Sequence, residues 1–235
     1  MAGKGKRTLP LGNFKPFIKI AGKEMLSWFI SSIKHSVKER DTFLLITLSG
    51  NYKRYDFIKV TKKIFQDNRL NNKLEYYEIP TTPRGTSETV LLSKNLINRL
   101  SKVMVIYPDQ YTDFDLSSVK NGYGYLGVCV NFGNKSGFVQ IENGKVIRFV
   151  EKTNISNIAS SGFYLFPSGK DLIYGIRKQI ESSDSLNGEF YLGPSINFLI
   201  RKGIKVFPIE VKAKYNLGNP EDIAYFAKNC VDKFS

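Results

Sequence analysis

Apolar residues along the first hundred positions fall into two alternating patterns. In residues 22–37 they recur every three or four positions and mark one face of a helix: Met25, Leu26, Phe29, Ile30 and Ile33. Residues 43–48 instead form a nearly continuous apolar run of strand length, as expected for a strand covered on both faces. The same patterns predict two further helices, over residues 55–67 and 86–100, and two further strands, over residues 74–79 and 103–107. This alternation is typical of a doubly wound α/β sheet.

The second half of the chain is richer in hairpins. Glycine turns such as Asn143-Gly144 join three predicted strands, over residues 122–130, 137–142 and 146–151. Beyond them the sequence predicts one more strand, over residues 161–166, and three helices, over residues 170–182, 191–202 and 221–231. Because there is neither an internal repeat nor a low-complexity linker, we expect a single mixed-sheet domain over residues 1–235.

The chain opens on a glycine turn, residues 1–5, that has no strand before it. A glycine loop that binds phosphate normally leaves the end of a buried strand. The loss of a central strand would leave its neighbours unpaired. We therefore expect that the sequence is truncated or its start misplaced, and that the upstream DNA encodes several apolar residues.

Composition narrows the class of protein. A hydrophobic fraction of 42% supports a real core, and a charged fraction of 24% with 13% aromatic residues excludes a disordered chain. No apolar run approaches the roughly 18 to 20 residues of a membrane helix, and no signal peptide is present, so a soluble cytoplasmic protein is expected. Two cysteines and one histidine make a disulfide framework, a histidine-rich metal site or a Ser-His-Asp triad improbable. The net charge of +14 points to nucleic acid, an anionic membrane or phosphorylated small molecules.

Two N-terminal segments suggest phosphate chemistry. Residues 2–8 (AGKGKRT) combine glycines with three cations, and glycine lets backbone N–H groups approach an anion closely. Taken alone, this segment is equally consistent with a flexible basic tail. Residues 14–25 (FKPFIKIAGKEM) then add a Lys-Pro pair just before the first predicted helix.

Together these two segments resemble the start of the sugar-1-phosphate nucleotidylyltransferases, which combine a G-x-G-x-R loop with a Lys-Pro pair. Six further segments resemble motifs of that family in the same order: residues 83–89 (PRGTSET), 107–110 (YPDQ), 149–153 (FVEKT), 160–166 (SSGFYLF), 188–192 (GEFYL) and 217–222 (LGNPED). Each motif is modest, but the ordered set identifies the chain as a member of this family.

The resemblance implies a fold and a reaction. The fold is Rossmann-like, a three-layer GT-A-like α/β arrangement with a mixed central sheet that here lacks its first strand. Residues 1–110 would form the nucleotide-binding half and residues 111–235 the acceptor-binding half. The reaction would be Mg²⁺-dependent transfer of a nucleotidyl group from an NTP to a phosphorylated small molecule, such as a sugar 1-phosphate, with release of pyrophosphate. Such enzymes make nucleotide sugars, for example for capsule or other cell-surface polysaccharides.

The resemblance also implies roles for individual residues. The two catalytic cations are Arg7 and Lys15. The nucleotide-binding positions are Ala2, Gly3, Gly5, Lys6, Pro80, Gly85 and Thr86. Asp109 is the magnesium ligand, and the acceptor-binding positions are Glu151, Lys152, Gly162 and Glu189. Such a set fits the chemistry, because nucleotidyl transfer depends on positioning and charge neutralisation rather than on covalent catalysis.

Several of these residues have a structural alternative. Lys15 could be a solvated loop lysine and Asp109 a turn former after proline. Glu151-Lys152 could be an exposed strand pair, and Glu189 an acid facing a helix N-terminus. The sequence also departs from the family pattern: Thr153 replaces a proline, Asn219 a threonine, and Asn216 stands where many members carry a second metal-binding aspartate. Asn216 is a poor Mg²⁺ ligand.

Three other functions stay open. A glycosyltransferase that uses nucleotide sugars is suggested by the D-x-D pattern of Asp113-Phe114-Asp115. A non-catalytic or regulatory homologue is suggested by Asn216, and a nucleic-acid binder by charge alone. We favour the nucleotidyltransferase, with an NTP and a phosphorylated acceptor as partners and neither nucleic acid nor membrane. The sequence leaves open a homo-oligomer, the nucleotide base and the identity of the acceptor.

Overall fold

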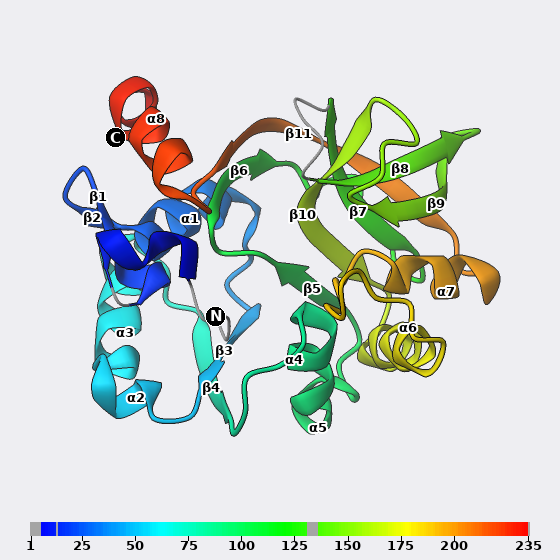
Figure 1. The fold of residues 1–235 in the computed structure, drawn as a ribbon, viewed down its shortest axis with the longest axis horizontal. Coiled ribbons are helices and arrows are strands. Elements are labelled where there is room, and N and C mark those ends of the chain that lie inside the picture. The colour runs from blue at the N-terminus through cyan, green and yellow to red at the C-terminus, as the bar shows by residue number, and fades with distance from the viewer. Residues whose placement is uncertain (1–5, 13, 131–135, 235) are drawn as a thin grey trace. The chain divides into compact units, whose positions relative to one another are not determined.

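The computed structural model describes residues 6–12, 14–130 and 136–234. The chain divides into two compact units, each of which contains helices and strands (Figure 1). The first unit comprises Met1–Thr82, Tyr107–Phe114 and Lys212–Ser235, and the second comprises Pro83–Ile106 and Asp115–Val211. Within the described ranges, no helix is long and apolar enough to cross a membrane.

The first unit is built from short strands and helices. Its strands are β1 (Lys19–Ile20), β2 (Lys23–Glu24), β3 (Thr42–Leu48), β4 (Lys73–Ile79) and β6 (Gln110–Phe114). Its α-helices are α1 (Met25–Ile33), α2 (Asn51–Arg54), α3 (Phe57–Asp67), α8 (Pro220–Asn229) and α9 (Val231–Phe234). Three 3₁₀ turns complete it: η1 (Lys6–Leu11), η2 (Lys15–Phe17) and η3 (Lys34–Ser36).

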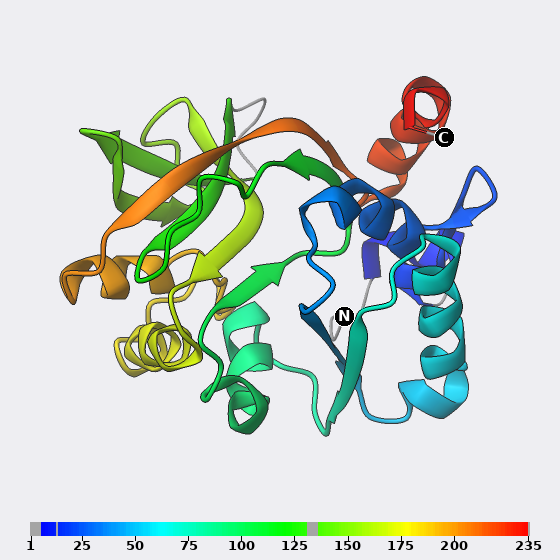
Figure 2. The same ribbon diagram turned by 180° about the vertical axis from the view of Figure 1, so that it is seen from behind.

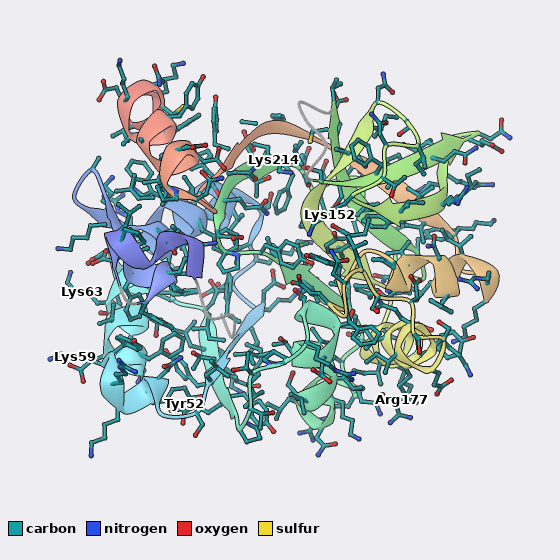
Figure 3. The ribbon with its side chains drawn as sticks, in the orientation of Figure 1. Tyr52, Lys59, Lys63, Lys152, Arg177 and Lys214 are labelled. Carbon is teal, nitrogen blue, oxygen red and sulfur yellow. The ribbon has the colours of Figure 1, made fainter. Side chains whose placement is uncertain are left out.

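The strand β3 pairs in parallel with β4, in register from Thr42 opposite Lys73 to Leu48 opposite Ile79. The helix α3 lies between these two strands in the chain and forms a βαβ unit with them. Phe57 and Ile64 of α3 are buried, whereas Lys59 and Lys63 point away from the ribbon into solvent (Figure 3). The predicted alternation of helix and strand is therefore confirmed in this part of the chain.

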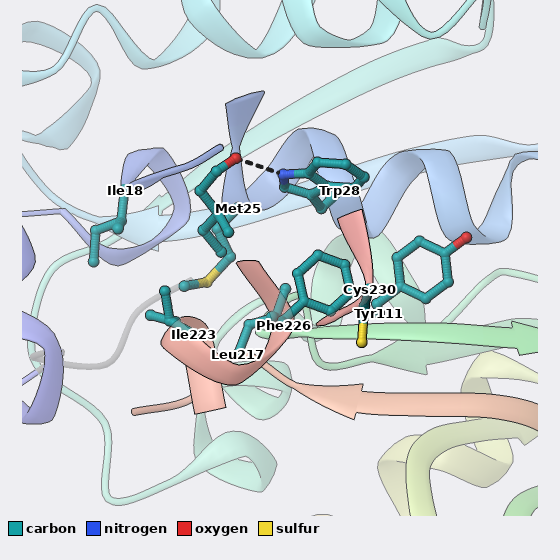
Figure 4. Packing of buried hydrophobic residues seen from close by; sticks show 9 residues of the cluster. Ile18, Met25, Trp28, Tyr111, Leu217, Ile223, Phe226 and Cys230 are labelled. Carbon is teal, nitrogen blue, oxygen red and sulfur yellow. Dashed lines mark hydrogen bonds between the residues drawn. The ribbon is translucent and has the colours of Figure 1, made fainter. Parts of the chain in front are cut away.

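A buried cluster joins the two ends of the first unit (Figure 4). The Trp28 ring of α1 packs edge-on against Phe226 of α8 at 5.3 Å between centroids, and its Nε1 donates to the carbonyl oxygen of Ile20 at 2.8 Å. Tyr111 of β6 and Leu217 belong to the same cluster. This core fixes the two segments that contain Asp109 and Asn216, the positions that the sequence singled out for metal binding.

The second unit holds the larger sheet. Its strands are β5 (Val103–Ile106), β7 (Gly124–Val130), β8 (Gly137–Glu142), β9 (Lys145–Glu151) and β10 (Ile158–Phe166). Its helices are α4 (Thr86–Leu92), α5 (Lys94–Ile97), α6 (Gly169–Glu181) and α7 (Ser195–Arg201), with α6 and α7 side by side in both ribbon views (Figures 1 and 2). The long strand β11 (Val206–Asn216) starts in this unit and ends in the first.

The sheet of the second unit is mixed. Its order is β11-β7-β10-β8-β9, and β5 also pairs with β10. β11 runs parallel to β7 and is seen as a long curved ribbon in Figure 2, whereas β10 is antiparallel to β5, β7 and β8. A mixed sheet flanked by helices confirms the predicted fold class. The strand expected before the glycine turn would precede Met1 and therefore lies outside the described residues.

Several boundaries differ from the sequence prediction. The helix expected over residues 86–100 is interrupted at Ser93, whose hydroxyl donates to the carbonyl oxygens of Thr89 and Val90 and competes with the helical pattern. The helix expected from residue 191 begins only at Ser195. β6 and β11 were not predicted: β6 carries polar residues, and Pro208 lies inside β11, where proline normally argues against a strand.

Candidate functional site

In the first unit, three chain segments meet around one ion pair. Lys15 Nζ lies 2.6 Å from Asp109 Oδ2 and donates to the carbonyl oxygen of Gly218 at 3.2 Å. The backbone N–H of Leu217 donates to the Asp109 carbonyl oxygen at 2.8 Å, which ties the segment before α8 to the start of β6. The side chains of Lys15 and Asp109 are 19% and 35% exposed, so solvent and small ligands can reach the pair.

Glycine at position 218 keeps this pair accessible. A Cβ atom there would stand 3.5 Å from Asp109 Oδ2 and 3.7 Å from Lys15 Nζ, in van der Waals contact with both groups. The next residue, Asn219, caps α8: its Oδ1 accepts from the Asp222 N–H at 2.9 Å, and its Nδ2 donates to Asp222 Oδ2 at 2.7 Å. Asn219, which replaces the family's threonine, therefore still caps the N-terminus of α8.

The carboxylates of the first unit limit the kind of metal that could bind. Asp109 is the carboxylate paired with Lys15, and Asn216, at the exposed end of β11, is neutral. Across the part of the chain that the structure describes, no group of three or more metal-ligating side chains exists. One carboxylate fits Mg²⁺ that keeps phosphate and water as its other ligands, and does not fit a metal held wholly by protein.

In the second unit, Lys152, Tyr191 and Glu189 form a chain of hydrogen bonds. Lys152 Nζ donates to the Tyr191 hydroxyl, which donates to Glu189 Oε2. The Lys152 ammonium also lies 4.2 Å from the centroid of the Tyr191 ring. Lys152 adopts a left-handed backbone conformation with φ of 52°, directly after β9. Two residues predicted from the sequence are therefore brought together by a third, Tyr191, which stood in the GEFYL motif without an assigned role.

Glu151 ends β9 beside this network. Burial raises the pKa of its carboxyl to about 7; the nearby charge of Glu189 adds to the rise and that of Lys152 opposes it. The end of β9 is held from α7, because Asn197 Oδ1 accepts from the Phe149 N–H and Asn197 Nδ2 donates to the Phe149 carbonyl, each at 2.8 Å. No local sequence pattern points to Asn197, because its partner is the backbone of Phe149, 48 positions away.

Also in the second unit, the predicted nucleotide loop (residues 83–87) contacts the predicted acceptor loop (residues 188–192). The Phe190 N–H donates to the Arg84 carbonyl oxygen at 2.6 Å, and the Ser87 N–H donates to the Phe190 carbonyl oxygen at 3.1 Å. Gly85 has φ of 127°, and a Cβ atom there would lie 2.4 Å from the Phe190 carbonyl oxygen. Only glycine fits this close approach of two backbones. Thr86 follows as the first residue of α4.

The remaining predicted residues are distributed as follows. Gly162 is buried in β10 with φ of 87°, at a shift in register against β7. Pro80 is exposed directly after β4, in the first unit. Ala2, Gly3 and Gly5 lie outside the described residues, and Lys6 and Arg7 are described only through the backbone of η1.

The two aspartates of the D-x-D pattern have protein partners. Asp113 Oδ1 lies 3.0 Å from His35 Nε2 in the first unit. In the second unit, Asp115 accepts from the backbone N–H and the hydroxyl of Ser117, each at 2.8 Å. Carboxylates engaged in this way are structural, which weakens the glycosyltransferase alternative.

Comparison with known proteins agrees with the motif order. Among curated proteins, the chain is 27% identical over 248 residues to the bifunctional protein GlmU of Methanococcus maripaludis strain S2, covering 100% of this chain and 55% of that protein. It is also 27% identical over 206 residues to the mannose-1-phosphate guanylyltransferase catalytic subunit beta of Dictyostelium discoideum, covering 80% of this chain and 55% of that protein. The chain thus spans about half the length of the curated relatives it matches.

A solved structure supports the same fold. The nucleoside-diphosphate-sugar pyrophosphorylase from Vibrio cholerae RC9 superposes with a TM-score of 0.82 at 24% identity, covering 97% of this chain and 98% of that one. The family model described as nucleotidyl transferase matches residues 1–191, most of the chain. The chain belongs to the nucleotidyl transferase family.

Proposed function

We propose that the protein couples an NTP to a phosphorylated small molecule, a sugar 1-phosphate, with release of pyrophosphate. The observation that carries the proposal is the contact of 2.6 Å between Lys15 and Asp109, to which the motif resemblance assigns the roles of a catalytic cation and a metal ligand. The names of the relatives, among them mannose-1-phosphate guanylyltransferase, support an acceptor of this class.

The reaction is an in-line displacement at phosphorus. A phosphate oxygen of the acceptor forms a bond to the α-phosphorus of the NTP, the bond from that phosphorus to the β-phosphate oxygen breaks, and pyrophosphate leaves with the electron pair. No proton transfer from a histidine or cysteine is required, which suits a chain with one histidine. The protein therefore contributes by orienting the phosphates and neutralising their charge.

The first-unit group acts on the NTP. Lys15, already oriented by Asp109 and the Gly218 carbonyl, places a positive charge for the phosphates. Asp109 would hold a magnesium ion that enters with the NTP, and such an ion would supply further neutralisation of phosphate charge. A single protein carboxylate is consistent with that arrangement, since the other ligands come from phosphate and water.

The second-unit network acts on the acceptor. Lys152 is exposed and supplies a cation for the acceptor phosphate, while Glu151 and Glu189 supply carboxyl oxygens for the hydroxyl groups of a sugar. Tyr191 orients both Lys152 and Glu189 through its hydroxyl. One cation beside two carboxyl groups matches a ligand that carries one phosphate and several hydroxyls.

The proposal is tested by measuring pyrophosphate release from the four common NTPs with a panel of sugar 1-phosphates and other phosphorylated metabolites. We expect one combination to react in the presence of Mg²⁺ and Asp109→Asn to abolish that reaction. Asp67→Asn is the matched control, because Asp67 forms an exposed ion pair with Lys63 at 2.7 Å outside the site. Full activity of Asp109→Asn would contradict the metal assignment.

A non-catalytic homologue is the second candidate, favoured by the neutral Asn216. Such a protein would be stabilised by an NTP in a thermal-shift assay, because a ligand that binds the folded state raises its melting temperature. It would nevertheless release no pyrophosphate with any acceptor of the panel. Restoring a carboxylate with Asn216→Asp would then be expected to raise metal affinity.

A further inference from the structure

One buried amide connects the nucleotide loop with the acceptor loop inside the second unit. Gln179 belongs to α6 and is 0% exposed, yet it lies in none of the family motifs. Leu172, Ile176 and Gln179 follow one another on α6 at spacings of four and then three, so an apolar residue would be expected to continue this buried face at position 179. A fully buried polar side chain is normally hydrogen-bonded, so the amide of Gln179 is expected to have specific partners.

Those partners are the two loops. Gln179 Oε1 accepts from the Ser87 hydroxyl at 2.8 Å, and Ser87 is itself 0% exposed at the start of α4. Gln179 Nε2 donates to the Tyr191 carbonyl oxygen at 2.7 Å and to the Asp184 carbonyl oxygen at 3.1 Å. The Ser87 hydroxyl also lies 3.1 Å from the Tyr191 carbonyl oxygen. A single side chain therefore bonds to groups that are 104 positions apart in the chain.

The backbone contacts between Arg84, Ser87 and Phe190 run beside this amide, so the two loops form one hydrogen-bonded body. The residues proposed to contact the substrates adjoin these two loops. Thr86 directly precedes Ser87, and the Tyr191 hydroxyl hydrogen-bonds to both Lys152 and Glu189. A displacement at Gln179 would move both loops together. An apolar residue of the same shape would leave the Ser87 hydroxyl and the Tyr191 carbonyl without this partner.

We propose that Gln179 is a positioning residue that holds the nucleotide loop and the acceptor loop in one arrangement and thereby sets the affinity for both substrates. The inference rests on the proposed function for the identity of the two substrates. The inference goes beyond the proposed function because it assigns the positioning of both loops to a residue of α6 that is not proposed to contact either substrate. The loops themselves, and their dependence on Gln179, are properties of the unliganded protein.

Hydrogen exchange followed by mass spectrometry tests this dependence without any substrate. In Gln179→Met we expect exchange to rise roughly tenfold in peptides covering residues 84–90 and, equally, residues 186–192, with α1 and α3 unchanged. Gln140→Met is the matched control: Gln140 donates to Glu142 within β8, and its loss should leave both loops as they are. Faster exchange in one loop alone, or in all peptides to the same extent, would overturn the proposal.

The kinetic arm uses the NTP and acceptor identified by pyrophosphate release. Gln179→Met should raise the KM of both substrates by a similar factor, roughly tenfold, with a smaller change in kcat. A rise in one KM alone would overturn the proposal, whereas an absence of any reacting substrate pair would refute the proposed function and leave the exchange result standing. If Gln179→Met does not fold, Ser87→Ala takes its place, because it removes the bond between α4 and Gln179 and should loosen the same two loops.

Discussion

The ammonium of Lys15 lies 2.6 Å from a carboxylate oxygen of Asp109, although 94 positions separate the two residues along the chain. The contact exists because Tyr111, two residues beyond Asp109, is anchored in the buried cluster with Trp28 and Phe226. Leu217, in the same cluster, donates its backbone N–H to the Asp109 carbonyl. The packing of the first unit thus holds together a charged pair that is still partly exposed to solvent.

Lys15→Met should lower kcat for pyrophosphate release by roughly 10²- to 10³-fold, the loss typical of removing one preorganised charge from a transition state. Because Asp109 stays 35% exposed and can be solvated, the melting temperature should change little. Steady-state kinetics and thermal unfolding measure the two effects. Lys63→Met, which breaks the exposed pair with Asp67, is the control. Activity within twofold of the parent would show that Lys15 is not a catalytic cation and that its pairing with Asp109 is structural.

The raised pKa of Glu151 predicts a pH-dependent stability. Between about pH 4.5 and 7 the folded protein retains the proton on Glu151, while the unfolded chain loses it, so the free energy of unfolding falls as pH rises through this window. Relative to Glu151→Gln, which stays neutral, the parent should lose on the order of 3 kcal/mol across it. Denaturant unfolding of both proteins at pH 5, 6, 7 and 8 gives the difference.

The neighbouring charges provide a check on that result. The charge of Glu189 raises the pKa of Glu151 and the charge of Lys152 lowers it. Glu189→Gln should therefore shift the transition in unfolding free energy to lower pH, and Lys152→Met should shift it to higher pH. Shifts in the opposite directions, or an equal pH dependence in Glu151→Gln and the parent, would show that the folded structure does not raise the pKa of Glu151 in this way.

The sequence predicted those parts of the site that lie in motifs and next to regular patterns. Lys15, Asp109, Lys152 and Glu189 are assigned to the site by the resemblance to the nucleotidylyltransferases, because each lies in a short motif whose order along the chain can be compared. The parts it missed depend on contacts that no local pattern contains. The amide of Asn197 meets the backbone of Phe149 only after α7 packs beside β9.

The fold was predictable to a similar extent and for a similar reason. Apolar strands such as β3 and amphipathic helices such as α3 follow from hydrophobic periodicity alone. β6 was not predicted, because its buried side chains include the polar Gln110 and Thr112. Its neighbour in the sheet, β11, also comes from a distant part of the chain. Strand pairing between distant segments supplies what the local sequence does not indicate.

Asp113→Asn separates the nucleotidyltransferase from a glycosyltransferase of the D-x-D type. Because Asp113 pairs with His35 at 3.0 Å and is partly exposed, its loss should change stability by no more than about 1 kcal/mol and leave pyrophosphate release unaffected. Release of NDP from nucleotide sugars is measured in parallel. Loss of such an activity in Asp113→Asn would restore the glycosyltransferase assignment.

Gly85→Ala should disable the contact between the nucleotide loop and the acceptor loop. The new Cβ atom would stand 2.4 Å from the Phe190 carbonyl oxygen, and the residue would have to keep φ of 127°, a conformation that costs a non-glycine residue about 1–3 kcal/mol. We therefore expect a drop in unfolding free energy of more than about 2 kcal/mol together with weaker NTP binding, measured by denaturant unfolding and calorimetric titration. Gly50→Ala is the matched control, because Gly50 also has a positive φ, 85°, but faces open space; its cost should stay near 1 kcal/mol. Equal destabilisation by both substitutions would mean that backbone conformation alone, and not the approach to Phe190, requires glycine at position 85.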